Sequence, residues 1–271
     1  MARPPMYPYR EILPAIVYWP YRAWRTALTG LSFAVFWGAV LAVGWLWLPL
    51  VWLWPGDRRA KIRRVHRSAR AGFAAFHALL RGLRLYRRTS PVRALRPDGK
   101  PVVVIANHPT LLDVTSIVSW FPDVVAIARP GFASHPLIAP VVRACGFVST
   151  GPHVLRDGEE RLRMGFDVLV FPEGTRTPLD GPPNPFHRGA FELAARAGAS
   201  IVLLKLTCAP SALSKRLPIW KVADRTAVLT IEPIAVLDPP RAHDRAGGSR
   251  AMCRAIEQRY RELLGYGGRD S

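Results

Sequence analysis

The stretch "PVVVIANHPTLLDVTS", residues 101–116, combines a strand-like segment with two candidate functional residues. Residues 102–105 are consecutive β-branched aliphatic side chains, a pattern typical of a short buried strand. His108 follows the strand, and a lone carboxylate, Asp113, comes five residues later among apolar neighbours. Pro109 suits the first turn of a helix. The stretch therefore predicts a strand, then a turn that carries an imidazole, then a helix.

The spacing of His108 and Asp113 fits a hydrogen-bonded pair. A helix that starts beside His108 places Asp113 a little more than one turn further on, where its carboxylate can fold back to one imidazole nitrogen. Such a pair fixes the tautomer, stabilises the imidazolium and leaves the other nitrogen to accept a proton from a hydroxyl. The alternative is an aspartate that caps the helix and a histidine satisfied within the core. The spacing alone leaves both interpretations open.

A second stretch, "DVLVFPEGTRTP" at residues 167–178, repeats the layout of an apolar strand followed by a turn. Its turn contains Glu173, Gly174, Thr175 and Arg176. Glycine allows backbone conformations that other residues resist. Loop amides, a hydroxyl and a guanidinium, which binds anions through two parallel hydrogen bonds, together suit a phosphate. The alternative is an ordinary turn at the end of a strand.

Strand-like and helix-like segments alternate beyond residue 100. This alternation predicts an α/β fold with a mixed sheet flanked by helices. The predicted strands are 102–106, 124–128, 167–171, 201–207 and 227–231, and the predicted helices are 110–120, 136–145, 158–163, 189–197 and 250–264.

Residues 27–56 contain no charged side chain, and a bilayer span needs only about 20 apolar residues. Tryptophans crowd the second half, as in an aromatic belt, and arginines flank both ends. A secretory signal peptide fits poorly, because the run is long, starts late and lacks a small-residue cleavage site. The alternative is a buried core helix. The positive-inside bias favours a cytoplasmic location for the chain after Asp57.

The formal net charge is +19, and residues 58–96 contain many arginines but no acidic residue. Such a segment suits an anionic partner, either lipid headgroups or nucleic acid. The neighbouring apolar run favours lipid, and no nucleic-acid recognition motif is present, so we expect no nucleic acid partner. Apolar residues at steps of three and four over residues 58–88 predict a helix in the membrane interface. The alternative is a helix packed on the soluble domain, and the two interpretations are compatible if the helix bridges both.

These features divide the chain into three parts. Residues 1–26 are an aromatic and Pro-rich lead-in, residues 27–90 a membrane-associated helical element, and residues 91–271 the α/β domain. Residues 88–101 are interpreted as a linker or hairpin. The three cysteines have no metal-ligand spacing, predict no metal site or disulfide framework, and agree with a reducing compartment.

The two stretches resemble motifs of the glycerolipid acyltransferase family that includes 1-acylglycerol-3-phosphate acyltransferases. Asn107, His108 and Asp113 match the family's first motif, which is Asn-His, four residues, Asp. Residues 171–176, "FPEGTR", match its third motif without exception. Weaker similarity in "FHRGAFELAARAGASIVLL" and "TIEPI" extends the resemblance over residues 95–264.

The resemblance implies transfer of an acyl group from a thioester to the hydroxyl of a lysophospholipid such as 1-acylglycerol-3-phosphate, in phospholipid biosynthesis. The donor would be acyl-coenzyme A or acyl carrier protein, with no metal and no other cofactor. Membrane lipids and the acyl carrier would be the partners, at the bacterial inner membrane with the catalytic domain cytoplasmic. His108 would be the base and Asp113 its orienting partner. The substrate-binding residues would be Asn107, Arg129, Glu173, Gly174, Thr175 and Arg176.

Three departures from the family pattern concern the acceptor. The arginine that family members carry after a Gly-Phe-Ile-like stretch is missing after Val148. Arg129 stands where the family often has lysine, and we expect it to compensate. The fourth motif, usually rich in Val and Pro, is "IVLLKL" here. The acceptor therefore stays open among lysophospholipids, ornithine lipids, glycolipids and polyene pigments. A non-catalytic lipid-binding protein on the same fold is the remaining alternative.

Overall fold

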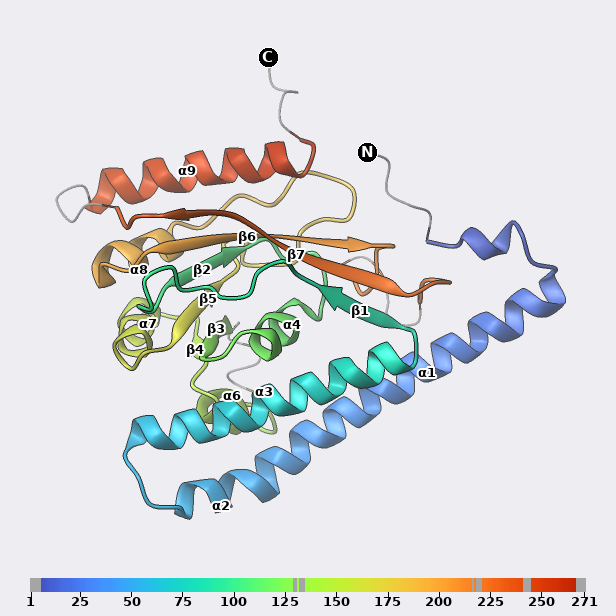
Figure 1. Ribbon diagram of the computed structural model, residues 1–271, viewed down its shortest axis with the longest axis horizontal. Coiled ribbons are helices and arrows are strands. Elements are labelled where there is room, and N and C mark those ends of the chain that lie inside the picture. Colours follow the sequence, from blue (N-terminus) through green and yellow to red (C-terminus); the bar gives the residue numbers. More distant parts are fainter. Residues whose placement is uncertain are drawn as a thin grey trace.

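The structure is a computed structural model that describes residues 6–128, 131, 135–215, 217, 221–240 and 245–266. Within these residues the chain forms a seven-stranded sheet between layers of helices (Figure 1). Only β6 and β7 run antiparallel, and every other neighbouring pair is parallel, which confirms the predicted mixed sheet. In spatial order the strands are β1 (Tyr86–Thr89), β7 (Ala227–Leu237), β6 (Ile201–Ala209), β2 (Val103–Ala106), β5 (Asp167–Val170), β3 (Val124–Ala128) and β4 (Val148–Ser149).

Helices cover both faces of the sheet. Alternate residues of β2 point to opposite faces, so that Val104 packs with one core cluster and Val103 and Ile105 with the other. Because both faces are covered, β2 has the uninterrupted apolar sequence of a buried parallel strand. One face is covered by α3 (Arg58–Gly82) and α4 (Asp113–Trp120), and the other by α7 (Val154–Arg163), α8 (Gly189–Ala197) and α9 (Arg245–Leu263), while α6 (Ala139–Ala144) connects β3 to β4.

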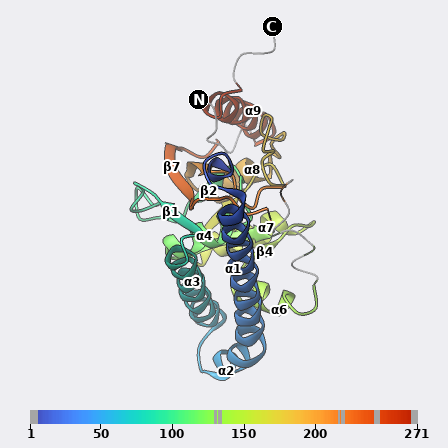
Figure 2. The ribbon, with the colours of Figure 1, turned by 90° about the vertical axis from the view of Figure 1, so that its right-hand side faces the viewer.

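The N-terminal apolar run is helical. After a short 3₁₀ turn, α1 (Ala15–Ala42), a π-helical turn (Val43–Trp47) and α2 (Leu48–Leu53) form one helix, which runs antiparallel to α3 (Figures 1 and 2). In the described part of the chain it is the one helix long and apolar enough to cross a membrane, by length and composition. Only 11% of its most apolar window is buried. Its exposed large apolar side chains include Ile16, Trp24, Leu31, Trp45, Leu46 and Leu53.

The amphipathic helix α3 packs on the domain. Its apolar positions Ile62, Val65, Phe76 and Leu80 are buried inside the protein, as the packed alternative predicts. The N-terminal helix in turn packs on α3, where the ring centroid of Phe36 lies 4.7 Å from that of Phe76. The two helices therefore form a hairpin attached to the sheet.

The helix predicted over residues 58–88 is shorter in the structure. It ends at Gly82, and the segment that follows forms β1, which pairs in parallel with residues 227–230 of β7. Arg88 and Thr89 thus lie in a strand and not in the predicted linker. Pairing between segments so far apart in the chain leaves no signal in the local periodicity.

The strand predicted over residues 227–231 is longer, because β7 continues to Leu237. It passes through Pro233, which has no N–H to donate to the partner strand. A register shift between Leu203 and Leu204 of β6 lies opposite this proline and accommodates the missing donor.

Candidate active site

The two sequence motifs meet at one edge of the sheet. β2 and β5 are parallel neighbours, with Val103 opposite Val168, so the segments after their carboxyl ends lie side by side. His108 follows β2, and its imidazole stacks on the ring of Phe171 after β5, with centroids 4.3 Å apart and planes 21° apart. A layered α/β sheet places its reactive groups at this kind of edge.

The carboxylate of Asp113 is fully buried and holds the imidazole of His108. Its Oδ2 lies 2.8 Å from His108 Nδ1 and accepts the N–H of Thr110 at 2.7 Å, while Oδ1 accepts the Thr110 hydroxyl at 2.5 Å. This carboxylate makes Nδ1 the protonated nitrogen of a neutral imidazole. Nε2 has no hydrogen-bond partner among the described residues, and the side chain is 18% exposed. The base-like pair predicted from the spacing is therefore formed, with one nitrogen available to a hydroxyl.

Asn107 has a different environment. Its Nδ2 donates to Leu206 O at 2.8 Å, and its Oδ1 accepts the N–H of Leu206 at 2.8 Å. The side chain thereby continues the pairing of β2 with β6 past the end of β2. Its amide is engaged by the backbone of β6, and its contact with substrate stays a prediction. The helix predicted over residues 110–120 begins later, because α4 starts at Asp113 with Leu112 as its N-cap residue.

Glu173 connects the second motif to the backbone of His108. One carboxylate oxygen accepts the N–H of His108 at 3.2 Å and the hydroxyl of Thr177. The other accepts the backbone N–H of Asn184 at 3.0 Å and its side-chain amide at 2.9 Å. Thr177 completes this joint, by which we mean the hydrogen bonds that link the loop at His108 to the loop at Glu173 and Thr177. Its N–H donates to His108 O at 2.7 Å, and its hydroxyl accepts His108 N–H at 2.9 Å. Glu173 is only 3% exposed, so its carboxylate faces the protein.

The rest of the turn presents polar groups beside this joint. Gly174 has φ +60°, and a Cβ there would come within 3.2 Å of the ring of His187, so the position requires glycine. Thr175 is half-buried. Arg176 donates from Nη1 to Leu213 O at 2.9 Å, which ties the turn to the segment before β7. Arg129, expected to assist, lies outside the described residues.

Comparison with known proteins agrees with the resemblance found in the two motifs. Residues 87–206 match the family model described as Acyltransferase. The matched segment contains both motifs of the candidate active site. A chloroplastic 1-acyl-sn-glycerol-3-phosphate acyltransferase of Brassica napus is 31% identical over 119 residues, 41% of this chain and 34% of that protein.

Two further relatives extend the comparison. The beta form of human 1-acyl-sn-glycerol-3-phosphate acyltransferase is 32% identical over 114 residues, 39% of this chain and 41% of that protein. This chain spans about a third of the length of the first curated relatives it matches. The crystal structure of PlsC from Thermotoga maritima, a 1-acyl-sn-glycerophosphate acyltransferase, has a TM-score of 0.64 at 19% identity and covers 92% of this chain and 100% of that chain. That likeness establishes the shared fold.

Tyr86 and Cys208, two buried groups near Asp113, are protonated at neutral pH. Burial, and then the nearby Asp113 charge, raise the pKa of the Tyr86 hydroxyl. The same two causes raise the pKa of the Cys208 thiol to about 12. Cys208 is therefore a thiol and not a nucleophilic thiolate. Among the described residues, no group of three or more His, Cys, Asp or Glu side chains could hold a metal ion.

Sequence reasoning missed three residues of this candidate active site. Thr110 completes the shell of Asp113, Thr177 joins the two motifs, and Asn184 holds Glu173. Thr110 and Thr177 lie inside the two quoted stretches, where a polar residue next to a motif was the available signal. Asn184 lies in a Pro-rich loop, where the sequence carried no signal of its role.

Proposed function

We propose that this chain catalyses the transfer of an acyl group from a thioester to the hydroxyl of a lysophospholipid-type acceptor at a membrane. The observation that carries the proposal is the pairing of His108 with the buried Asp113 at the edge where both motifs meet. The His108 side chain is 18% exposed beside the fully buried Asp113, and its Nε2 has no hydrogen-bond partner among the described residues.

In the proposed mechanism, His108 Nε2 accepts the proton of the acceptor hydroxyl while its oxygen attacks the thioester carbonyl. The imidazolium is stabilised by the Asp113 carboxylate, 2.8 Å from Nδ1. The tetrahedral intermediate collapses with cleavage of the carbon–sulfur bond, and the leaving thiolate takes the proton from His108. A general base of this kind contributes about 10²–10⁴-fold in rate. The thioester is a substrate, carried by coenzyme A or acyl carrier protein, and no other cofactor takes part.

The acceptor proposed first is 1-acylglycerol-3-phosphate. The support is the similarity to 1-acyl-sn-glycerol-3-phosphate acyltransferases of Brassica napus and human, together with Arg176 and Thr175 on the turn beside the base. Arg176 provides a guanidinium suited to a phosphate. The missing arginine after Val148 favours an acceptor with a different anionic or polar head, such as another lysophospholipid or an ornithine lipid, as the second candidate.

Membrane association is proposed for the element at residues 27–90. Its support is the N-terminal helix, which is long, apolar and mostly exposed. The arginine-rich α3 runs beside that helix (Figure 2). A full crossing of the bilayer would draw these arginines into hydrocarbon at about 2.5–3.5 kcal/mol each. We therefore place the hairpin in one leaflet, at the bacterial inner membrane with the catalytic domain cytoplasmic. Full-length protein that washes off membranes in carbonate contradicts this placement.

The decisive assay uses purified protein in detergent, with each lysolipid of a panel tested against acyl-coenzyme A and acyl carrier protein donors. We expect acylation of at least one anionic lysolipid and none by a folded His108→Ala variant. Turnover that survives in this variant, with an unchanged melting temperature, excludes His108 as the base. Absence of turnover by the unaltered protein with every acceptor and both donors supports the non-catalytic alternative.

A further inference from the structure

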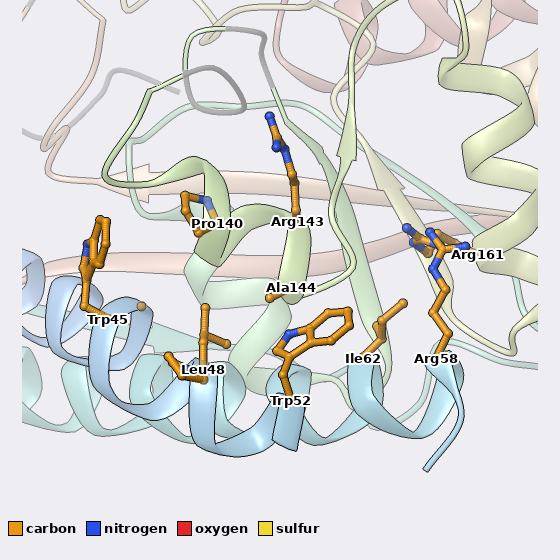
Figure 3. Close-up of a pocket in the computed structure, with 11 residues that line it drawn as sticks. Trp45, Leu48, Trp52, Arg58, Ile62, Pro140, Arg143, Ala144 and Arg161 are labelled. Carbon is orange, nitrogen blue, oxygen red and sulfur yellow. The ribbon is translucent and has the colours of Figure 1, made fainter. Parts of the chain in front are cut away.

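A cavity of about 490 Å³ lies between the N-terminal helix and α6 (Figure 3). This volume is within the range of about 300–1,000 Å³ that is usual for small-molecule sites. Most of the wall is apolar. It is formed by Trp45, Leu48 and Trp52 of the N-terminal helix, Ile62 of α3, and Pro140 and Ala144 of α6.

One end of the cavity is cationic. The head groups of Arg58 and Arg161 come together there, and Trp45 lies at the opposite end (Figure 3). Both arginines pair with the same carboxylate, that of Glu160. Arg161 is 7% exposed and is fixed by a hydrogen bond from Nε to Gly146 O at 2.8 Å. Two guanidiniums that share one carboxylate leave an excess positive charge beside an apolar wall.

An adjoining cavity extends the cationic end. It shares Arg58 and Arg161 with the first cavity and is bordered also by Arg156 and Arg163. Asp157 and Glu160 are the acidic residues on its wall. Arg156 is paired with Asp157 and Arg163 with Glu159, so the net positive charge at the cationic end is the excess of Arg58 and Arg161 over Glu160, which favours an anion over a zwitterion.

The cationic end is remote from the base in the topology of the sheet. His108 follows the carboxyl end of β2, and the parallel pairing of β2, β5, β3 and β4 places all their carboxyl ends at one edge. Arg161 lies in the segment that leads into the amino end of β5, and it bonds Gly146, which precedes β4. The cationic end thus lies toward the opposite edge from His108.

We propose that this cavity binds an anionic phospholipid of the surrounding membrane, separate from the reacting substrates. An acyl chain lies along Trp45, Trp52 and Ile62, and the phosphate meets Arg58 and Arg161. The source is the membrane because Trp45 and Trp52 are 57% and 46% exposed, on the same helix that carries the largest exposed apolar side chains. A soluble phosphate would leave the apolar wall unused. The proposal rests on the membrane association proposed above and is independent of the acceptor's identity.

The test is native mass spectrometry of the full chain in detergent. It is titrated separately with dioleoylphosphatidylglycerol, dioleoylphosphatidylcholine and inorganic phosphate. We expect one tightly retained phosphatidylglycerol, with phosphatidylcholine about tenfold weaker and no phosphate retained at the same concentration. Arg58 is the residue to change, because it is exposed and holds no backbone group of another element. Arg58→Gln should weaken phosphatidylglycerol binding by about two- to fivefold, within the range for a partly solvated charge contact.

Two further variants separate this site from general surface charge. Glu160→Gln removes the carboxylate that competes for Arg58 and should tighten binding. Arg67→Gln removes an exposed arginine of the same helix outside the cavity and should leave binding unchanged. Equal effects of Arg58→Gln and Arg67→Gln, or a weakening by Glu160→Gln, overturn the proposal.

The remaining outcomes distinguish other ligands. Equal retention of both lipids, or phosphate retained as well as phosphatidylglycerol, overturns the proposal. Displacement of the lipid by free coenzyme A assigns the cavity to the acyl donor and also overturns it. The measurement counts bound lipid without turnover, so its failure is distinct from failure of the acylation assay.

Discussion

Replacing Glu173 by glutamine tests whether this residue positions the base or contacts the acceptor. Its carboxylate accepts hydrogen bonds from the N–H of His108, the hydroxyl of Thr177 and two nitrogens of Asn184. Glutamine keeps the shape but has one acceptor oxygen and one NH₂ group. With either orientation of the new amide, its NH₂ faces a backbone N–H, that of His108 or that of Asn184.

The magnitude follows from the burial of this group. Hydrogen bonds to charged groups contribute about 1.5–3 kcal/mol, and a buried donor left without a partner costs about 1–3 kcal/mol. Water does not replace the lost partner, because Glu173 is 3% exposed. We therefore expect Glu173→Gln to lower the free energy of unfolding by about 2–4 kcal/mol. Loss of the His108 contact should lower kcat by about ten- to a hundredfold, at 1.4 kcal/mol for each factor of ten.

The assay varies acceptor and donor separately and records a melting curve for each protein. We expect a lower kcat and a lower melting temperature, with the acceptor KM little changed. Glu192→Gln on α8 is the matched control, because it removes a carboxylate whose ion pairs lie at the surface. A raised acceptor KM with unchanged kcat and melting temperature would refute the positioning role and show that Glu173 binds the acceptor directly.

Asp113→Asn should lower kcat by at least about a hundredfold in a folded protein, because an amide does not stabilise the imidazolium; single-turnover rates measure this, and an unchanged rate excludes the pair. Arg176→Lys should raise the acceptor KM or lower kcat/KM, and Arg176→Ala should cost about 1.5–3 kcal/mol more, with the donor KM unchanged. Steady-state kinetics that leave both acceptor parameters intact would make the turn purely structural. Burial lowers the pKa of His66 from 6.5 to about 4, so the unfolded chain binds the proton first as pH falls. Stability should fall between pH 6.5 and about 4, by roughly 3 kcal/mol in all, and His66→Leu should flatten this slope in denaturant titrations; an unchanged slope assigns the pH dependence to other groups.

The parts of the site that follow from local sequence were predictable. Each motif comes directly after a short apolar run, and parallel strands bring such segments to one edge. β3 and α8 begin and end where the sequence places them, because their apolar patterns are bounded by turn residues. The pairing of His108 with Asp113 was predicted from a helix that starts beside His108, but α4 starts at Asp113, and a non-helical turn before it brings the carboxylate to the imidazole.

The parts that depend on distant segments were not predictable. β1 exists because residues 227–230 lie beside it, and β4 has only two residues, too few for a periodic signal. The direction of the apolar face of α3 was also ambiguous. An amphipathic helix has the same sequence pattern whether a sheet or a membrane covers it, and only the packing decides.

The exchange of hydrogen bonds between His108 and Thr177 has a consequence for protein engineering. Their backbone groups and one hydroxyl fasten loops that lie 69 residues apart in the chain. A chimaera could take residues 171–177 from a relative and keep residues 107–113 of this chain. It would combine two loops whose hydrogen bonds were not matched to each other. Transplants that move both loops together keep the catalytic geometry. Acceptor preference is therefore better altered beyond this joint, in the segment around Leu213 that Arg176 already touches.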